Sequence, residues 1–173
     1  MNILGLSYSY NNASAALLAD GKIVSAAQES LFNRVNNYNG FPIRAINFCL
    51  QSANITINDI DHISFPEKPY LLFSRIILNH LSEYPFSLKD FIKSMPGWLN
   101  QGLFLPISIK KELGYSGNIL FIKRSLSLSA SSFFFSPFDE AAILISDRIG
   151  NNFTLSWGIG KNNNINMLEE LSF

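Results

Sequence analysis

Hydrophobic and polar positions follow the same plan in two segments, one at the start of the chain and one near its end. Residues 2–27 alternate as expected for three short strands, with one turn at residues 11–12 and a glycine turn before the third strand. Residues 140–169 repeat this plan, with turns at 148–152 and 160–164. Backbone N–H groups exposed in such turns can hold an anion. The repeat therefore predicts either two phosphate-binding turns or two β-meanders without a ligand.

The segment between the meanders is typical of helices with a few short strands. Apolar residues three and four positions apart predict a helix from Pro42, with Cys49 buried on its inner face. Residues 28–41 lack a clear period and are expected to form an Asn-rich loop. We further expect helices at 70–81, 87–95 and 107–113, a short strand at 62–65 and a buried strand at 118–122.

The stretch SLSLSASS at residues 125–132 favours two different structures. Its strict alternation of serine and apolar residues predicts a strand. The three phenylalanines and the Ser-Pro pair that follow suit a buried helix that ends at the proline. The pattern alone leaves both possibilities open.

The length, charge and cysteine content of the chain argue against several classes of function. The 173 residues suffice for one domain, or for one domain and the start of another, and 47% of them are hydrophobic. Only 15% are charged and the formal net charge is zero, which argues against nucleic-acid binding and fits a protein that has a partner. Cys49 is the only cysteine, so the sequence offers no disulfide framework and no thiolate metal cluster.

Targeting and membrane segments are not expected. The chain enters a strand at once, without the basic segment and hydrophobic run of a signal peptide. The apolar run near residues 69–81 is interrupted by Arg75 and is too short to cross a bilayer. We therefore expect a cytoplasmic protein that does not contact a membrane.

Seven segments in collinear order cover almost the whole chain and match one family. They are ILGLS from Ile3, ALLADGKIVSAAQES from Ala16, GFPIRAINFCL from Gly40, EKPYLLFSR from Glu67, FIKSMPGWL from Phe91, LSASSFFFSPFDEAAILISDRIG from Leu128 and the glycine turn between Trp157 and Gly160. In these segments the chain resembles the N-terminal part of the O-carbamoyltransferases of antibiotic tailoring and nodulation-factor decoration.

The resemblance implies an α/β, ribonuclease-H-like fold of the actin-like and sugar-kinase-like ATPases, related to the tRNA threonylcarbamoyl transferases. Residues 1–139 would form the first actin-like subdomain, and residues 140–173 the opening β-meander of an incomplete second one. In such enzymes a separate domain makes carbamoyl adenylate from carbamoyl phosphate and ATP. The actin-like domain then transfers the carbamoyl group to a substrate hydroxyl, with a bound divalent metal ion. The resemblance also implies that SLSLSASSFFF is helical.

The metal ligands of the family do not persist. An HHxxH motif places imidazoles on successive helical turns, where they can reach one metal ion. The matching positions here are Arg124, Ser125 and Leu128. Neither a guanidinium nor an isobutyl group can bind a metal ion. Asp147 is then the only candidate metal ligand that we can name.

The phosphate-binding turns are altered as well. Asn11 and Asn12 stand where the family has a histidine and its acidic neighbour, and Asn37 occupies a further histidine position. A carboxamide cannot shuttle protons near neutral pH as imidazole does. Arg148 replaces a glycine of the second turn, although its guanidinium could still hold an anion through two hydrogen bonds. The residues expected to line the two turns, and with them ATP or carbamoyl adenylate, are Asn11, Asn12, Ser14, Asp147, Arg148 and Gly150.

Three hypotheses follow from these departures. The chain could be part of a working carbamoyltransferase that a second polypeptide completes. It could be a non-catalytic partner or regulatory subunit of an intact carbamoyltransferase. It could also be a degenerate, truncated remnant without activity, since most of the lost residues are one base change from the family residue and the resemblance places only the first meander of the second subdomain in this chain.

Overall fold

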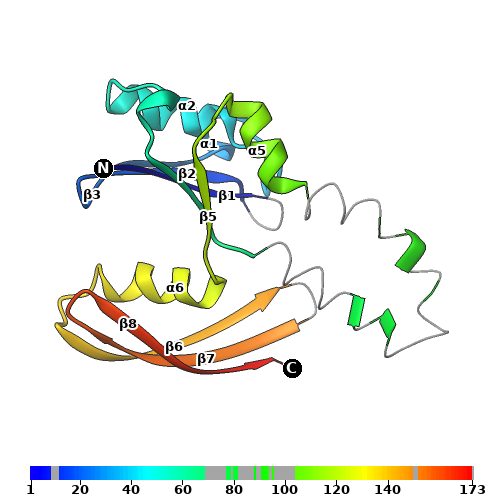
Figure 1. Cartoon of the computed structure of the whole chain (residues 1–173), viewed down its shortest axis with the longest axis vertical. Coiled ribbons are helices and arrows are strands. Elements are labelled where there is room, and N and C mark those ends of the chain that lie inside the picture. Colours follow the sequence, from blue (N-terminus) through cyan, green and yellow to red (C-terminus); the bar gives the residue numbers. More distant parts are fainter. Residues whose placement is uncertain are drawn as a thin grey trace. The chain divides into compact units, whose positions relative to one another are not determined.

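The computed structural model describes most of the chain and divides it into two compact units, Met1–Phe121 and Ile122–Phe173 (Figure 1). The described residues are 1–8, 12–68, 77–78, 80–81, 88, 91–93, 95, 104–149 and 152–172. Most residues of the expected helices at 70–81 and 87–95 lie outside this set, and those inside it are helical. None of the helices among the described residues is both long and apolar enough to cross a bilayer.

The first unit is built on a five-stranded mixed sheet in the order β3-β2-β1-β4-β5. Its strands are β1 (Asn2–Ser7), β2 (Ser14–Ala19), β3 (Lys22–Gln28), β4 (His62–Phe65) and β5 (Asn118–Phe121). Strands β1, β2 and β3 form an antiparallel meander, whereas β4 and β5 join β1 in parallel. An Asp20-Gly21 turn with positive φ at both residues joins β2 to β3, as two-residue hairpins require. This sheet bears out the expected ribonuclease-H-like, actin-like fold.

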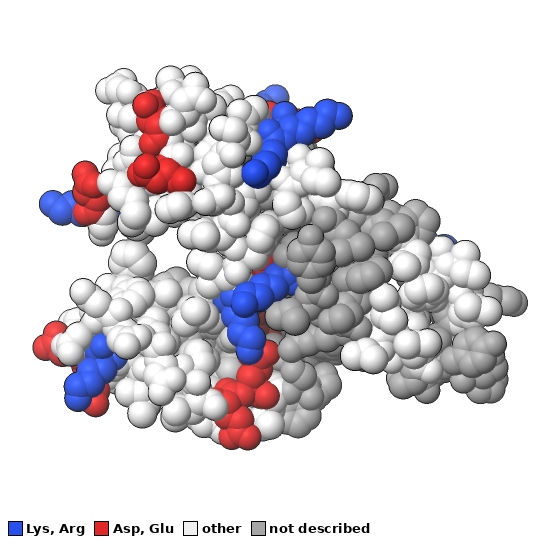
Figure 2. All heavy atoms as spheres, in the orientation of Figure 1, with Lys and Arg blue, Asp and Glu red and all other residues white. Residues whose placement is uncertain are grey.

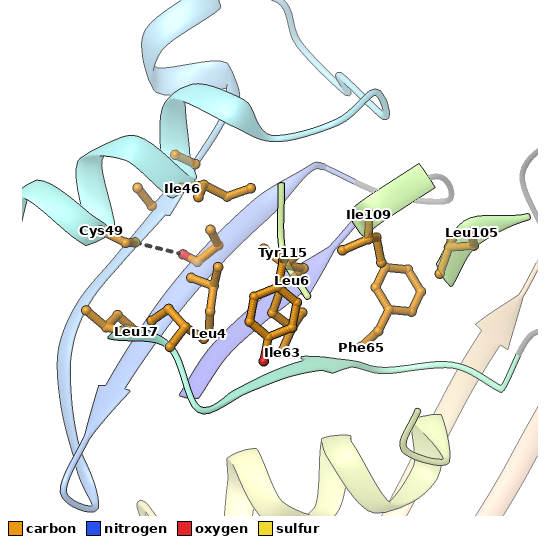
Figure 3. Packing of buried hydrophobic residues seen from close by; sticks show 14 residues of the cluster. Leu4, Leu6, Leu17, Ile46, Cys49, Ile63, Phe65, Leu105, Ile109 and Tyr115 are labelled. Atoms are coloured by element: carbon orange, nitrogen blue, oxygen red, sulfur yellow. Dashed lines mark hydrogen bonds between the residues drawn. The ribbon is translucent and has the colours of Figure 1, made fainter. Parts of the chain in front are cut away.

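The core of the first unit lies between this sheet and the helices that cover it. These elements are α1 (Ser30–Asn33), α2 (Ile43–Ser52), the 3₁₀ turn η1 (Ile57–Asp59) and α5 (Leu105–Leu113). Ile46 and Cys49 of α2 point toward Leu4 and Leu17 of the strands, and all four side chains are buried (Figure 3). The Cys49 thiol donates to the backbone oxygen of Ala15 at 3.6 Å, which confirms that it is a small core residue.

Two local predictions for the first unit are wrong. Residues 28–41 contain helix α1 rather than loop alone, because the backbone N–H groups of residues 32–34 bond to the carbonyls of Glu29 and Ser30. Strand β5 is not buried: its residues alternate between exposed and half-buried, since among the described strands it lies at the edge of the sheet and pairs only with β4.

The second unit consists of helix α6 (Arg124–Phe133) on a three-stranded antiparallel sheet of β6 (Glu140–Ile149), β7 (Asn152–Lys161) and β8 (Asn164–Ser172). Helix α6 covers one face of this sheet and contacts β6 and β8 (Figure 1). The serine-rich stretch is therefore helical, as the resemblance implied, and the strand suggested by its alternation is wrong. Ser129 and Phe133, four residues apart, form its buried stripe.

The boundary between subdomains at residues 139 and 140 stays a prediction. The compact units divide earlier, between Phe121 and Ile122, because α6 packs with the strands that follow it.

Candidate functional site

In the first unit, two segments that carry expected site residues lie side by side. The N–H of Ala13 donates to the carbonyl of Tyr38 at 2.7 Å, so the turn of Asn12 contacts the loop of Asn37. Ser14 begins β2, opposite Ser7 of β1 and Gln28 of β3. The structure thus brings the segments of Asn12, Ser14 and Asn37 together, whereas Asn11 lies outside the described residues.

The amides of this turn differ in their surroundings. The side-chain oxygen of Asn12 is buried and has no hydrogen-bond partner in the described part of the chain. Asn37 adopts a left-handed backbone with φ of 54°, which asparagine tolerates better than most residues. Asn37 therefore also shapes the loop that contacts the first turn.

Glu29 connects the first turn to helix α2 and was not among the residues singled out from the sequence. Its side chain is 3% exposed, and its Oε2 atom accepts the backbone N–H of Ala45 at 2.9 Å, in the first turn of α2. Its own N–H donates to the carbonyl of Ala13 at 2.8 Å. A carboxylate in this position interacts favourably with the helix dipole. Glu29 thus fixes the start of α2 relative to the turn.

Tyr8, which follows β1, is a second residue that the sequence did not reveal. Its ring packs edge-to-face against Phe41 at 5.4 Å and Phe65 at 5.3 Å between centroids. Burial raises the pKa of the Tyr8 phenol, and the charge of Glu112 adds a smaller effect in the same direction. The alternation of inward and outward residues along β1 could have indicated an inward tyrosine, but not its two aromatic neighbours.

Substitution of Tyr8 by phenylalanine is expected to weaken the loss of stability at high pH. The phenol's pKa is higher in the folded than in the unfolded chain, so its contribution is intact below about pH 10 and is lost as the pH rises further. The loss amounts to about 1.4 kcal/mol per pH unit above pH 10 for one such group. Urea unfolding at pH 9 and pH 11 tests this. Equal declines in the two proteins would contradict it.

In the second unit, the start of α6 lies against acidic side chains of the sheet. The Nε–H of Arg124 donates to Oδ2 of Asp147 on β6, and both side chains are about four-fifths buried. The Ser125 hydroxyl and the Lys123 ammonium donate to Oε2 of Glu170 on β8, at 3.1 and 3.2 Å. Asp147 therefore meets a side-chain cation where the resemblance implies a metal ligand.

The remaining residues of the second turn are only partly described. Asp147 and Arg148 belong to β6, the side chain of Arg148 is outside the described atoms, and Gly150 lies outside the described residues. Leu128 is half-buried on α6, one helical turn after Arg124.

A divalent metal ion does not fit the described side chains. Arg124 carries only donors and Leu128 has no polar atom, so neither offers a lone pair. Within the ranges that the structure describes, no group of three or more His, Cys, Asp and Glu residues could hold a metal ion. The metal implied by the resemblance is therefore not supported by this arrangement.

Surface charge agrees with the composition. On the face drawn in Figure 2, the basic and acidic side chains of the described residues form small separate groups with wide uncharged areas between them.

Comparison with solved structures places the fold. The YeaZ protein of Pseudomonas aeruginosa superposes with a TM-score of 0.59 over 99% of this chain and 67% of that chain, at 12% identity. A second Pseudomonas aeruginosa structure, described as an uncharacterized protein with similarity to peptidase YEAZ, gives a TM-score of 0.53 over 99% of this chain and 66% of that one, at 14% identity. At these identities the likeness concerns the fold alone.

Comparison with known sequences identifies the family. An uncharacterized protein of Synechocystis is 39% identical over 99% of this chain, which spans 29% of that relative's length. The nodulation protein NolNO of Sinorhizobium fredii is 28% identical over 82% of this chain, which spans 20% of it. An uncharacterized 19.2 kDa protein of Rhizobium etli is 32% identical over 56% of this chain and 57% of its own length. The family described as carbamoyltransferase N-terminus matches residues 2–173, and this chain belongs to it.

Proposed function

We propose that this chain is a carbamoyltransferase N-terminal domain in which transfer of a carbamoyl group to a substrate hydroxyl is lost or impaired. The observation that carries this proposal is the ion pair between Arg124 and Asp147. It fills the position from which the resemblance expects a metal ion to be held. A chain that cannot hold that ion lacks the charge stabilisation that a metal supplies to such a reaction.

The first turn adds a second reason. A carbamoyl transfer to a hydroxyl needs a group that accepts the hydroxyl proton as the new bond forms. Asn12 and Asn37, which stand at acidic and histidine positions of the resemblance, do not titrate near neutral pH. Their amides can bind and orient a phosphate or a carbamoyl group, but they cannot move a proton. We therefore expect that these replacements abolish carbamoyl transfer but can leave binding of ATP or carbamoyl adenylate intact.

Calorimetric titration with ATP and with carbamoyl phosphate, each with and without Mn²⁺, tests this proposal. We expect any binding to be independent of the metal ion, because Arg124 already occupies the carboxylate. In Asp147→Asn, which removes the candidate metal ligand, any binding should likewise be independent of Mn²⁺. Saturable binding that requires Mn²⁺ and disappears in Asp147→Asn would overturn the proposal.

A second candidate function is binding to an intact carbamoyltransferase in the cytoplasm. It is favoured by the sheet face that α6 does not cover, where Leu144 and Ile159 are exposed on neighbouring strands. Exposed apolar side chains of this kind are typical of protein interfaces. Size-exclusion chromatography with the full-length nodulation protein NolNO of Sinorhizobium fredii tests this function. We expect a joint peak that Leu144→Ser weakens, and separate elution of the two proteins would contradict it.

A further inference from the structure

The N-cap and the first turn of helix α6 form a cluster of charged side chains with the sheet beneath them. Arg124 donates to Asp147, and Lys123 donates to Glu170 at 3.2 Å, so two cations face two carboxylates on different strands. The Arg124 and Asp147 side chains are 21% and 19% exposed, whereas Lys123 is 53% exposed. The inner pair is therefore shielded from water more than the outer one, and its electrostatic interaction is correspondingly stronger.

The positions around Arg124 have the spacing of a metal site. Residues i and i+4 of a helix lie one above the other on the same face, so position 128 lies one turn along from Arg124. Arg124 itself reaches Asp147, which shows that this part of α6 is within side-chain distance of the β6 carboxylate. Two imidazoles at positions 124 and 128, together with Asp147, would supply two nitrogens and an oxygen, a common set of ligands for transition metals.

We infer that the Arg124 guanidinium takes the place of a metal ion in this chain. It supplies a fixed positive charge at Asp147, so the carboxylate is neutralised without a divalent cation. Because a guanidinium has no lone pair and stays protonated, it also repels any metal ion that approaches. The inference rests on the proposed loss of metal-dependent transfer, and it assigns that loss to one residue.

Conversion of the cluster back to a metal site tests the inference. The double variant Arg124→His, Leu128→His is titrated with Co²⁺, and the visible absorption of the bound ion is recorded. We expect saturable binding on the order of 100-fold tighter than in the unchanged chain. Removal of the third ligand by Asp147→Asn in the same background should weaken binding by at least about 10-fold.

The matched control keeps the arginine. Leu128→His alone adds one imidazole while the Arg124 guanidinium remains, so it should bind Co²⁺ no better than the unchanged chain. Equally tight binding by Leu128→His and the double variant would overturn the inference, as would saturable binding by the unchanged chain that depends on Asp147. A folded double variant that binds no Co²⁺ would also overturn the inference, because positions 124, 128 and 147 would then not form a metal site.

A single substitution at Arg124 provides a second test in case the double variant does not fold. Arg124→Gln removes the charge and keeps a side chain of similar reach. Millimolar Mn²⁺ is expected to raise the thermal unfolding midpoint of Arg124→Gln by on the order of 2–4 °C. The midpoint of the chain without substitutions should stay the same. Equal shifts in both proteins would overturn the inference. None of these measurements uses ATP or carbamoyl phosphate, so their outcome is independent of the calorimetric test of the proposed function.

Discussion

Replacement of Phe133 by alanine is expected to lower the free energy of unfolding by about 3–5 kcal/mol. Phe133 lies at the end of α6 and is only 4% exposed. Its ring fills the space above Gly160 of β7, where a Cβ atom would come within 2.7 Å of three ring carbons. The loss combines the removed apolar area with the cavity left between helix and sheet. Urea unfolding followed by circular dichroism measures it.

The next residue in the chain provides the matched control. Phe134 has the same side chain at the C-cap of the same helix, but it is 50% exposed. Phe134→Ala should therefore change the free energy of unfolding by less than about 1 kcal/mol. Similar losses for the two variants would mean that Phe133 is not the residue that fixes α6 on the sheet.

The Phe133→Ala substitution is also expected to affect the candidate site. Helix α6 carries Arg124 at its first position and Phe133 at its last. If the anchor at one end is lost, the helix can shift and the ion pair between Arg124 and Asp147 is held less firmly. Phe133 thus stabilises the site through the helix, without contact with Asp147.

The hydrophobic pattern predicted the three-strand meander of each unit, but not that β4 and then β5 extend the first sheet beyond β1. Alternation and turn residues located β1, β2 and β3, because a meander with polar turns is encoded locally. The helical state of residues 124–133 was not encoded in this way. Their alternation favours a strand, whereas the phenylalanines and the Ser-Pro pair that follow suit a helix, so the packing of Ser129 and Phe133 on the sheet decides between the two.

Some residues of the candidate site could be named before the structure was known, whereas the contacts between them could not. The family resemblance singled out Asp147, and it also indicated that Arg124 and Leu128 stand at histidine positions. The partner of Arg124 could not be known, since it requires α6 to lie on β6. Glu29 and Glu170 were missed for the same reason: each gains its role from a hydrogen bond to a residue at least sixteen positions away.

Replacement of Gly158 by alanine is the second change with a large expected effect. A Cβ atom at this position would lie 2.5 Å from the carbonyl oxygen of Asn166 and 3.0 Å from the Cα of Met167. Both atoms belong to the backbone of β8, at the bulge where the register with β7 shifts. Strand β8 lies at the edge of the sheet but is hydrogen-bonded to β7, so its backbone moves aside less easily than the end of a side chain, and the variant should lose about 2–3 kcal/mol. Urea unfolding measures the loss.

Gly5→Ala is the control, because Gly5 also lies within a strand of a sheet. Its Cβ would meet Ser64 Oγ at 3.5 Å and the Ala16 carbonyl at 3.7 Å, both ordinary contacts. This variant should be neutral within about 0.5 kcal/mol, or slightly stabilised, since alanine restricts the unfolded chain more than glycine does. If Gly158→Ala were equally well tolerated, β8 could shift away from β7, and Glu170 would then not be held in a fixed position opposite Ser125. The pair of variants therefore tests whether the strand that carries Glu170 is rigid enough to fix the charges at the start of α6.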